Sequence, residues 1–282
     1  MTGVKASERL LQAYVVLFLL YLFLPLAIMV AATFNTSRFP TVTPWLGTTT
    51  RWFEVLWNDQ QMWRALWNSF VVAFAVIAVS VPIGVAAAML LSSLHRRART
   101  FLYAVMVSPL LTPGVIIGIS TLVFWERLGV KGGLHLAVIG QSSFIAAYVM
   151  LMVLARLQRF DPSLEEAALD LGASHAQAFR RVLFPHLRPA IVSGAVLAFF
   201  QSFENYNTTL FTRGTDSTLT IFIASKVRTG LTPAVNALGV ILITVTVAGA
   251  IGYEILRRRE AARAREATRR AQENALGDLR KV

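Results

Sequence analysis

The chain has 282 residues, of which 55% are hydrophobic and 15% charged, and its formal net charge is +12. This composition is far more apolar than that of a soluble domain and indicates an all-α, polytopic membrane protein. Cysteine is absent, which excludes disulfides, thiolate metal sites and cysteine nucleophiles.

Six apolar segments are long enough to cross a bilayer, because a spanning helix needs about 20 residues at a rise of about 1.5 Å per residue. The first is too long for the apolar region of a cleaved signal peptide, so we expect it to remain as a span. We treat residues 1–282 as one transmembrane domain, with predicted spans at residues 11–32, 69–94, 100–125, 134–155, 189–211 and 233–256.

The segment between the first two spans, residues 33–68, contains five of the six tryptophans of the chain. Tryptophan gathers at the membrane–water interface, so we expect an aromatic belt on short amphipathic helices there. Stacking on a carbohydrate or an amine is the alternative. The small-residue spacings Gly84–Ala88 and Gly114–Gly118 predict close helix packing.

Positive charge sets the predicted orientation. With six spans, 19 Lys and Arg residues lie on the side of the two termini and eight on the other side. The positive-inside rule therefore places both termini in the cytoplasm. The basic excess then reflects topology and predicts no nucleic-acid partner. The basic tail, residues 257–282, is expected to continue the sixth span as a helix with pairs such as Glu266 with Arg270, attracted to membrane lipid.

The loop between the fourth and fifth spans, residues 156–188, has helix signals of its own. Asp161-Pro162-Ser163 is a good helix start, and a first helix should run from there to Leu171. Gly172 can adopt a left-handed conformation and end that helix. A second helix, residues 174–184, should then stop at Pro185.

The same loop carries a motif. Glu166-Ala167-Ala168, three residues, Gly172, nine residues, then Val182-Leu183-Phe184-Pro185 resembles the EAA signature of permease subunits of binding-protein-dependent ABC importers. The resemblance implies that the first loop helix docks into a cytoplasmic ATPase. The residues it assigns to coupling are Glu165, Glu166, Ala167, Ala168, Asp170, Gly172, Ala173 and Pro185.

Partners follow from the same resemblance. No G-x-x-x-x-G-K-[ST] phosphate loop occurs in the chain, so ATP and Mg²⁺ would be used by a separate ATPase dimer, and this chain would bind no cofactor itself. A second permease, expected to be a different chain, would complete the pore in a bacterial inner membrane. A periplasmic binding protein would deliver the solute, and Asp216, Lys226 and Arg228 are candidate docking charges for it.

The region from Ala198 to Thr246 is similar to the spermidine/putrescine-type permeases. Glu204 is an acid within an apolar span, and such residues are functional candidates by default. It could neutralise an ammonium group of a polyamine, with Asn205, Asn207 and Thr208 as hydrogen-bonding groups. Alternatively, Glu204 lies at a break in the fifth helix and pairs with a partner permease.

Other solutes and other classes stay open at this point. Another small organic cation, an organophosphonate or a ferric complex would suit the same importer class. A secondary transporter or channel would need ionisable groups in several spans, yet only Glu204 and Glu254 are acids within the apolar segments. The four histidines show no metal-ligand spacing, and we predict neither a metal site nor a catalytic constellation.

Overall fold

The computed structural model describes residues 2–230 and 232–279. They form two compact units: unit 1 comprises Met1–Asn58 and Gly230–Val282, and unit 2 comprises Asp59–Thr229. Apart from an isolated bridge between Asn35 and Thr48, the regular elements of the described residues are all helical, which confirms the predicted all-α class.

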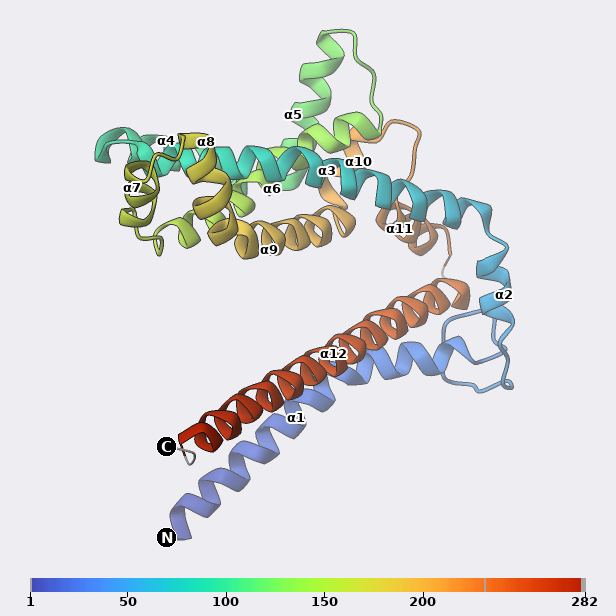
Figure 1. Cartoon of the computed structure of the whole chain (residues 1–282). Helices are drawn as coiled ribbons and strands as arrows, with labels where there is room; N and C mark the ends of the chain where they lie inside the picture. The colour runs from blue at the N-terminus through green and yellow to red at the C-terminus, as the bar shows by residue number, and fades with distance from the viewer. Residues whose placement is uncertain (1, 231, 280–282) are drawn as a thin grey trace. The chain divides into compact units, whose positions relative to one another are not determined.

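The helices carry the labels of Figure 1. They are α1 (Thr2–Thr33), α2 (Arg51–Trp57), α3 (Gln60–Ser93), α4 (Arg96–Leu111), α5 (Gly114–Arg127), α6 (Leu134–Leu157), α7 (Ser163–Asp170), α8 (His175–Ala178), the π-helix η1 (Phe179–Leu183), α9 (Phe184–Phe203), α10 (Asn207–Thr212), α11 (Leu219–Thr229) and α12 (Pro233–Leu279).

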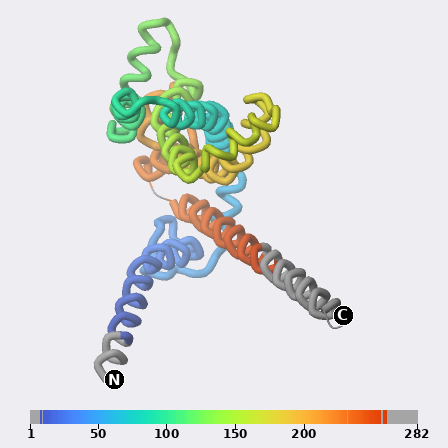
Figure 2. The backbone as a smooth tube through the Cα atoms, turned by 60° about the vertical axis from the view of Figure 1, so that its left-hand side comes forward, coloured from blue at the N-terminus to red at the C-terminus, as the bar shows by residue number. Residues whose placement is uncertain are grey.

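In unit 1, α12 packs on both α1 and α2. The α1–α12 contact is close at Gly239, where an added Cβ would lie 2.9 Å from the Met29 methyl carbon. Away from this contact the two helices diverge (Figure 2). Helix α12 continues beyond the predicted sixth span, as expected for the tail, and Glu254 pairs with Arg258 at 2.7 Å. The predicted Glu266–Arg270 pair lies outside the described side chains.

The loop after α1 is organised by Asn35. Its amide group donates to the carbonyls of Thr41 and Pro44, and its side-chain oxygen accepts from the amides of Ser37 and Leu46. The Asn35 carbonyl accepts the indole N–H of Trp52 at 2.8 Å. The aromatic-belt prediction is therefore wrong for Trp52, which is buried because its N–H satisfies a buried carbonyl.

Unit 2 is built on α3, α6 and α9, which pack on one another, while α5 projects away from them in both views (Figures 1 and 2). Val149 of α6 lies between two glycines. A Cβ added at Gly84 of α3 would be 2.7 Å from the Val149 Cβ, and one added at Gly194 of α9 would be 3.3 Å from a Val149 methyl carbon. Small residues thus let three helices approach closely, as the Gly84–Ala88 spacing predicted.

Five helices of the described chain are long and apolar enough to cross a membrane, and a sixth candidate is the bent pair α4 and α5. The predicted span at 100–125 is broken into two helices, α4 and α5, which are bent by 100° relative to each other. The cause is Pro113, which disfavours helical backbone in the preceding residue. Thr112 accordingly has φ −83° and ψ 124°.

Two other spans differ from the predicted boundaries. Helix α3 begins at Gln60, since the Asp59 carboxylate accepts the amides of Gln61 and Met62 and caps the helix there. Residues 60–68 of the predicted outward segment are thus helical. The fifth span, predicted at 189–211, is interrupted where α9 ends at Phe203.

Candidate functional site

Helix α7 begins where the sequence predicted. The Asp161 carboxylate accepts the Ser163 amide at 3.0 Å. Hydrogen bonds from the side chain and backbone of Ser163 hold the pKa of Asp161 below its ordinary value, because they stabilise the charged form. Glu165 and Glu166 lie in the first turn, where the helix dipole favours negative charge.

The end of α7 is a Schellman motif. Gly172 has φ +87°, its amide donates to the Leu169 carbonyl at 2.9 Å, and the Ala173 amide donates to the Ala168 carbonyl at 3.0 Å. This confirms the predicted left-handed stop. Beyond it, Ser174 and Gln177 form a capping box that starts α8.

The prediction that the second loop helix stops at Pro185 is wrong. Helix α8 passes through η1 into α9, and His175–Phe203 forms one continuous apolar helix. Pro185 is the second residue of α9. The π-helical turn before it takes up the disruption that a proline causes in a regular helix, as the Phe184 amide reaches back five residues to Phe179.

The base of this loop is tied to α6. Arg156 Nε donates to the His186 carbonyl at 3.0 Å, and His186 Nε2 lies 3.2 Å from the Arg156 carbonyl. The Phe160 ring lies beside the His186 ring, with centroids 5.1 Å apart. These contacts connect the end of α6 directly to the start of α9.

The motif residues form an open surface on this loop. Glu166, Ala167, Asp170, Gly172 and Pro185 are exposed, whereas Glu165, Ala168 and Ala173 are half-buried. Leu171 beside them is 90% exposed. A small-residue helix flanked by acids and one bare leucine offers a convex surface that could enter a groove of another protein.

The predicted substrate-pathway residues surround the break between α9 and α10. Glu204 caps the end of α9 and is exposed, with no ion-pair partner among the described side chains. Asn207 is also exposed, while Asn205 is half-buried and Thr208 fully buried. The structure therefore brings an exposed carboxylate and an exposed amide to an interruption of an apolar helix.

Asn205 and Thr208 make packing contacts instead. The Asn205 side-chain oxygen accepts from the Thr209 amide and hydroxyl at 3.2 and 3.1 Å. Thr208 Oγ1 donates to the Gly114 carbonyl at 3.1 Å. A Cβ at Gly118 would lie 2.8 Å from the Thr208 carbonyl oxygen, so α5 and α10 approach closely and hold the break in place.

A buried polar network that was not predicted from the sequence supports the break. Fully buried Gln141 of α6 donates to Thr209 Oγ1 at 2.8 Å and accepts from Ser202 Oγ at 2.5 Å. It thus joins α6 to α9 and α10. The available signal was Gln141 itself, a polar amide within an apolar span, which must find hydrogen-bond partners when it is buried.

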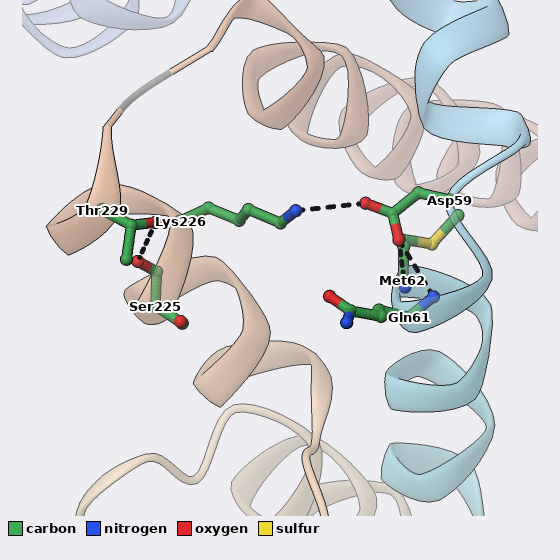
Figure 3. Close-up of polar contacts among 6 residues, drawn as sticks. All are labelled: Asp59, Gln61, Met62, Ser225, Lys226 and Thr229. Carbon is green, nitrogen blue, oxygen red and sulfur yellow. Dashed lines mark hydrogen bonds and ion pairs between the residues drawn. The ribbon is translucent and has the colours of Figure 1, made fainter.

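The candidate docking charges lie around α11. Lys226 Nζ is 3.3 Å from the Asp59 carboxylate that caps α3, as Figure 3 shows. Lys226 and Asp216 line a hollow of about 500 Å³. Arg228 donates to the Tyr206 hydroxyl at 3.1 Å. These polar groups are thus partly paired within unit 2.

Comparison with known proteins decides the family. Residues 80–262 match the model of the binding-protein-dependent transport system inner membrane component. The chain belongs to this family. It is therefore a permease subunit of an ABC importer, as the EAA-like motif predicted.

Curated relatives cover most of this permease. It is 30% identical over 239 residues to the spermidine/putrescine transport system permease protein PotC of Escherichia coli K12, which covers 84% of this chain and 90% of the relative. It is 32% identical over 258 residues to the putrescine transport system permease protein PotI of the same organism, covering 88% and 91%.

Solved structures share the fold. A bacterial ABC transporter involved in the import of the acidic polysaccharide alginate gives a TM-score of 0.69 at 14% identity, covering 92% of this chain and 98% of the other. An inward-facing methionine ABC transporter, MetNI, gives 0.53 at 21% identity, covering 73% and 96%. As the permease component, this chain binds no cofactor, and the ATP is used by a partner subunit.

Proposed function

We propose that this permease forms half of the pathway for a polyamine such as spermidine or putrescine. The observation that carries the proposal is Glu204, an exposed carboxylate without an ion-pair partner among the described side chains, at an interruption of an apolar helix. A carboxylate there can replace water around an ammonium group. The relatives named for spermidine and putrescine transport support the choice of cation.

Of the residues around Glu204, one can contact the solute and two hold the backbone in place. Asn207 is exposed and offers an amide oxygen to a second N–H group of the solute. Asn205 and Thr208 do not contact the solute in this proposal. Their side chains form hydrogen bonds with Thr209 and Gly114 and hold the backbone of the break in place. This chain offers one carboxylate, so the other ammonium groups of the polyamine would contact the second permease. We propose that the second permease is a different chain.

We further propose that α7 is the element that couples the pore to the ATPase. It has an exposed, small-residue surface on a rigid, capped helix, and the Arg156–His186 pair ties its base to α6 and α9. The ATPase dimer would lie in the cytoplasm beneath α7, and both termini would share that side of the inner membrane. The surface around Asp216, Lys226 and Arg228 would then face the binding protein.

Uptake of radiolabelled spermidine by the complete transporter in proteoliposomes tests the solute. Glu204→Gln removes the charge at nearly constant shape, and we expect uptake to fall by about tenfold or more, which is the loss of about 1.4 kcal/mol of interaction. Glu254→Gln is the matched control, because Glu254 is also an acid of an apolar span but is paired with Arg258. Equal uptake by Glu204→Gln and wild type would exclude the carboxylate from the pathway.

A competition series identifies the solute class. Spermidine, putrescine, a monovalent organic cation, an organophosphonate and a ferric complex are offered in excess over the labelled solute. We expect the two polyamines alone to compete. Competition by the phosphonate or the ferric complex would replace the polyamine with that solute.

ATP hydrolysis by the same proteoliposomes tests α7. Glu166→Lys reverses one exposed charge of the motif, and we expect solute-stimulated hydrolysis to be lost while the permease still inserts. Arg97→Glu, an exposed reversal outside the motif, serves as the control. Hydrolysis that is indifferent to Glu166→Lys would remove α7 from the coupling contact.

A further inference from the structure

A hollow of about 520 Å³ lies between the start of α4 and the end of α6. Its polar lining consists of Arg96, Arg99, Thr100, Tyr103 and Gln158, and no acidic residue lines it in the described part of the chain. Among the described side chains, neither arginine has an ion-pair partner. Two arginines therefore line one cavity that no acidic residue of the described chain lines.

The opposite wall of the hollow is apolar. Leu151, Leu154 and Ala155 of α6 provide it. Gln158, which also lines the hollow, caps the end of α6, and α6 is one of the helices apolar enough to cross a membrane. The cavity thus lies at the level where an apolar span gives way to polar residues, which is the depth of lipid headgroups.

We propose that this hollow binds the headgroup phosphate of an anionic phospholipid. The guanidinium groups of Arg96 and Arg99 match phosphate oxygens, and the Tyr103 hydroxyl and the Gln158 amide can donate further hydrogen bonds. The leucine wall accommodates the first part of an acyl chain. Basic pockets between membrane helices are typical sites for acidic headgroups.

Arg99 connects this site to the 156–188 loop. It also lines a second hollow of about 470 Å³, together with Pro162 and Glu165 at the start of α7. Figure 1 shows the start of α4 and α7 at the same end of unit 2. A lipid phosphate bound to Arg99 would therefore lie beside the helix that carries the EAA-like motif, and membrane composition could influence that helix.

The test is native mass spectrometry of the purified full-length chain in detergent, titrated with phosphatidylglycerol. The variant is Arg96→Gln with Arg99→Gln, and the matched control is Arg180→Gln with Arg181→Gln, which removes the same charge from η1 outside both hollows. We expect the affinity of the first variant to fall by about 30-fold, from about 1 kcal/mol per basic residue. The control should change by less than about twofold.

Three further probes separate the sources of the phosphate. Phosphatidylcholine should bind at least about tenfold more weakly than phosphatidylglycerol, because it has no net charge. Inorganic phosphate and glycerophosphoglycerol should not displace the lipid at equal concentration, since they lack the acyl chains that meet the leucine wall. Displacement by either, equal binding of phosphatidylcholine, or an equal loss in the control variant would each overturn the lipid site.

Discussion

The packing of Val149 between Gly84 and Gly194 gives a graded prediction. A methyl group added at Gly84 would lie 2.7 Å from both the Ala146 carbonyl oxygen and the Val149 Cβ. Neither atom is the end of a flexible side chain, so α3 or α6 must shift. Overpacking of this kind costs about 1–3 kcal/mol, and alanine recovers up to about 1 kcal/mol in a helix. We expect Gly84→Ala to lower the free energy of unfolding by about 1 kcal/mol.

Two other glycines provide reference substitutions for the free-energy change expected of Gly84→Ala. At Gly194 the nearest atom to an added Cβ is a Val149 methyl carbon at 3.3 Å, which a small shift relieves, so Gly194→Ala should be nearly neutral. At Gly249 nothing lies within 4 Å, and Gly249→Ala should stabilise by up to about 1 kcal/mol. Gly84→Ala and Gly249→Ala should therefore differ by about 2 kcal/mol, because the gain from alanine is common to both and only the overpacking cost remains.

The assay is unfolding of the purified full-length chain in mixed micelles by increasing sodium dodecyl sulfate, followed by circular dichroism. When Val149 is already alanine, Gly194→Ala should not lower the free energy of unfolding any further. The Val149 methyl groups that would meet the new Cβ are then absent. If Gly84→Ala unfolds at the same detergent fraction as Gly249→Ala, α3 and α6 have room for a methyl group at Gly84, and the close contact at Val149 is refuted.

Three more predictions concern the loops. In Gly172→Ala the new Cβ meets no atom within 4 Å, but the backbone keeps φ +87°, so the end of α7 should be destabilised by about 1 kcal/mol. Proteolysis at the end of α7 should become faster, and Gly172→Asn should slow it part of the way back to the wild-type rate. Trp52→Phe leaves a buried carbonyl unpaired and should destabilise unit 1 by about 1–3 kcal/mol in thermal unfolding, whereas Trp45→Phe, at an exposed side chain, should not. The carboxyl of Asp161 should titrate below 3.8 in NMR spectra of the labelled chain. Its contribution to α7 is present above that pH and is lost as the pH falls through the lowered pKa. Ser163→Ala should raise this pKa, because it removes the side-chain hydrogen bond that lowers it most, and an unchanged pKa would contradict that hydrogen bond.

Much of the helical plan follows from apolar length alone. The predicted span at 134–155 corresponds closely to α6, because its ends lie at Gly133 and at polar Gln158. The left-handed stop at Gly172 was also predictable, since few residues other than glycine adopt φ near +87°. In both cases a local property of the chain determines the structure.

Prolines were harder to interpret, because their effect depends on their surroundings. Pro113 ends α4 with a bend of 100° to α5, whereas Pro185 lies inside a continuous helix, preceded by a π-helical turn. The sequence predicted a helix end at Pro185, where the structure has a continuous helix. The buried Gln141 network was equally out of reach, since its partners Ser202 and Thr209 are distant in sequence and meet it only after the helices pack.

The two interruptions of the apolar helices meet at one place. Thr208, at the start of α10, donates to the Gly114 carbonyl at the start of α5, and the Asn205 carbonyl accepts the Thr220 hydroxyl at 3.1 Å. Irregular backbone at membrane depth persists only where protein or water satisfies its polar groups. Here the protein satisfies these carbonyls but leaves the Glu204 carboxylate exposed and unpaired among the described side chains. A charge in that position requires water, a partner subunit or a cation, and unchanged uptake by Glu204→Gln would exclude the cation.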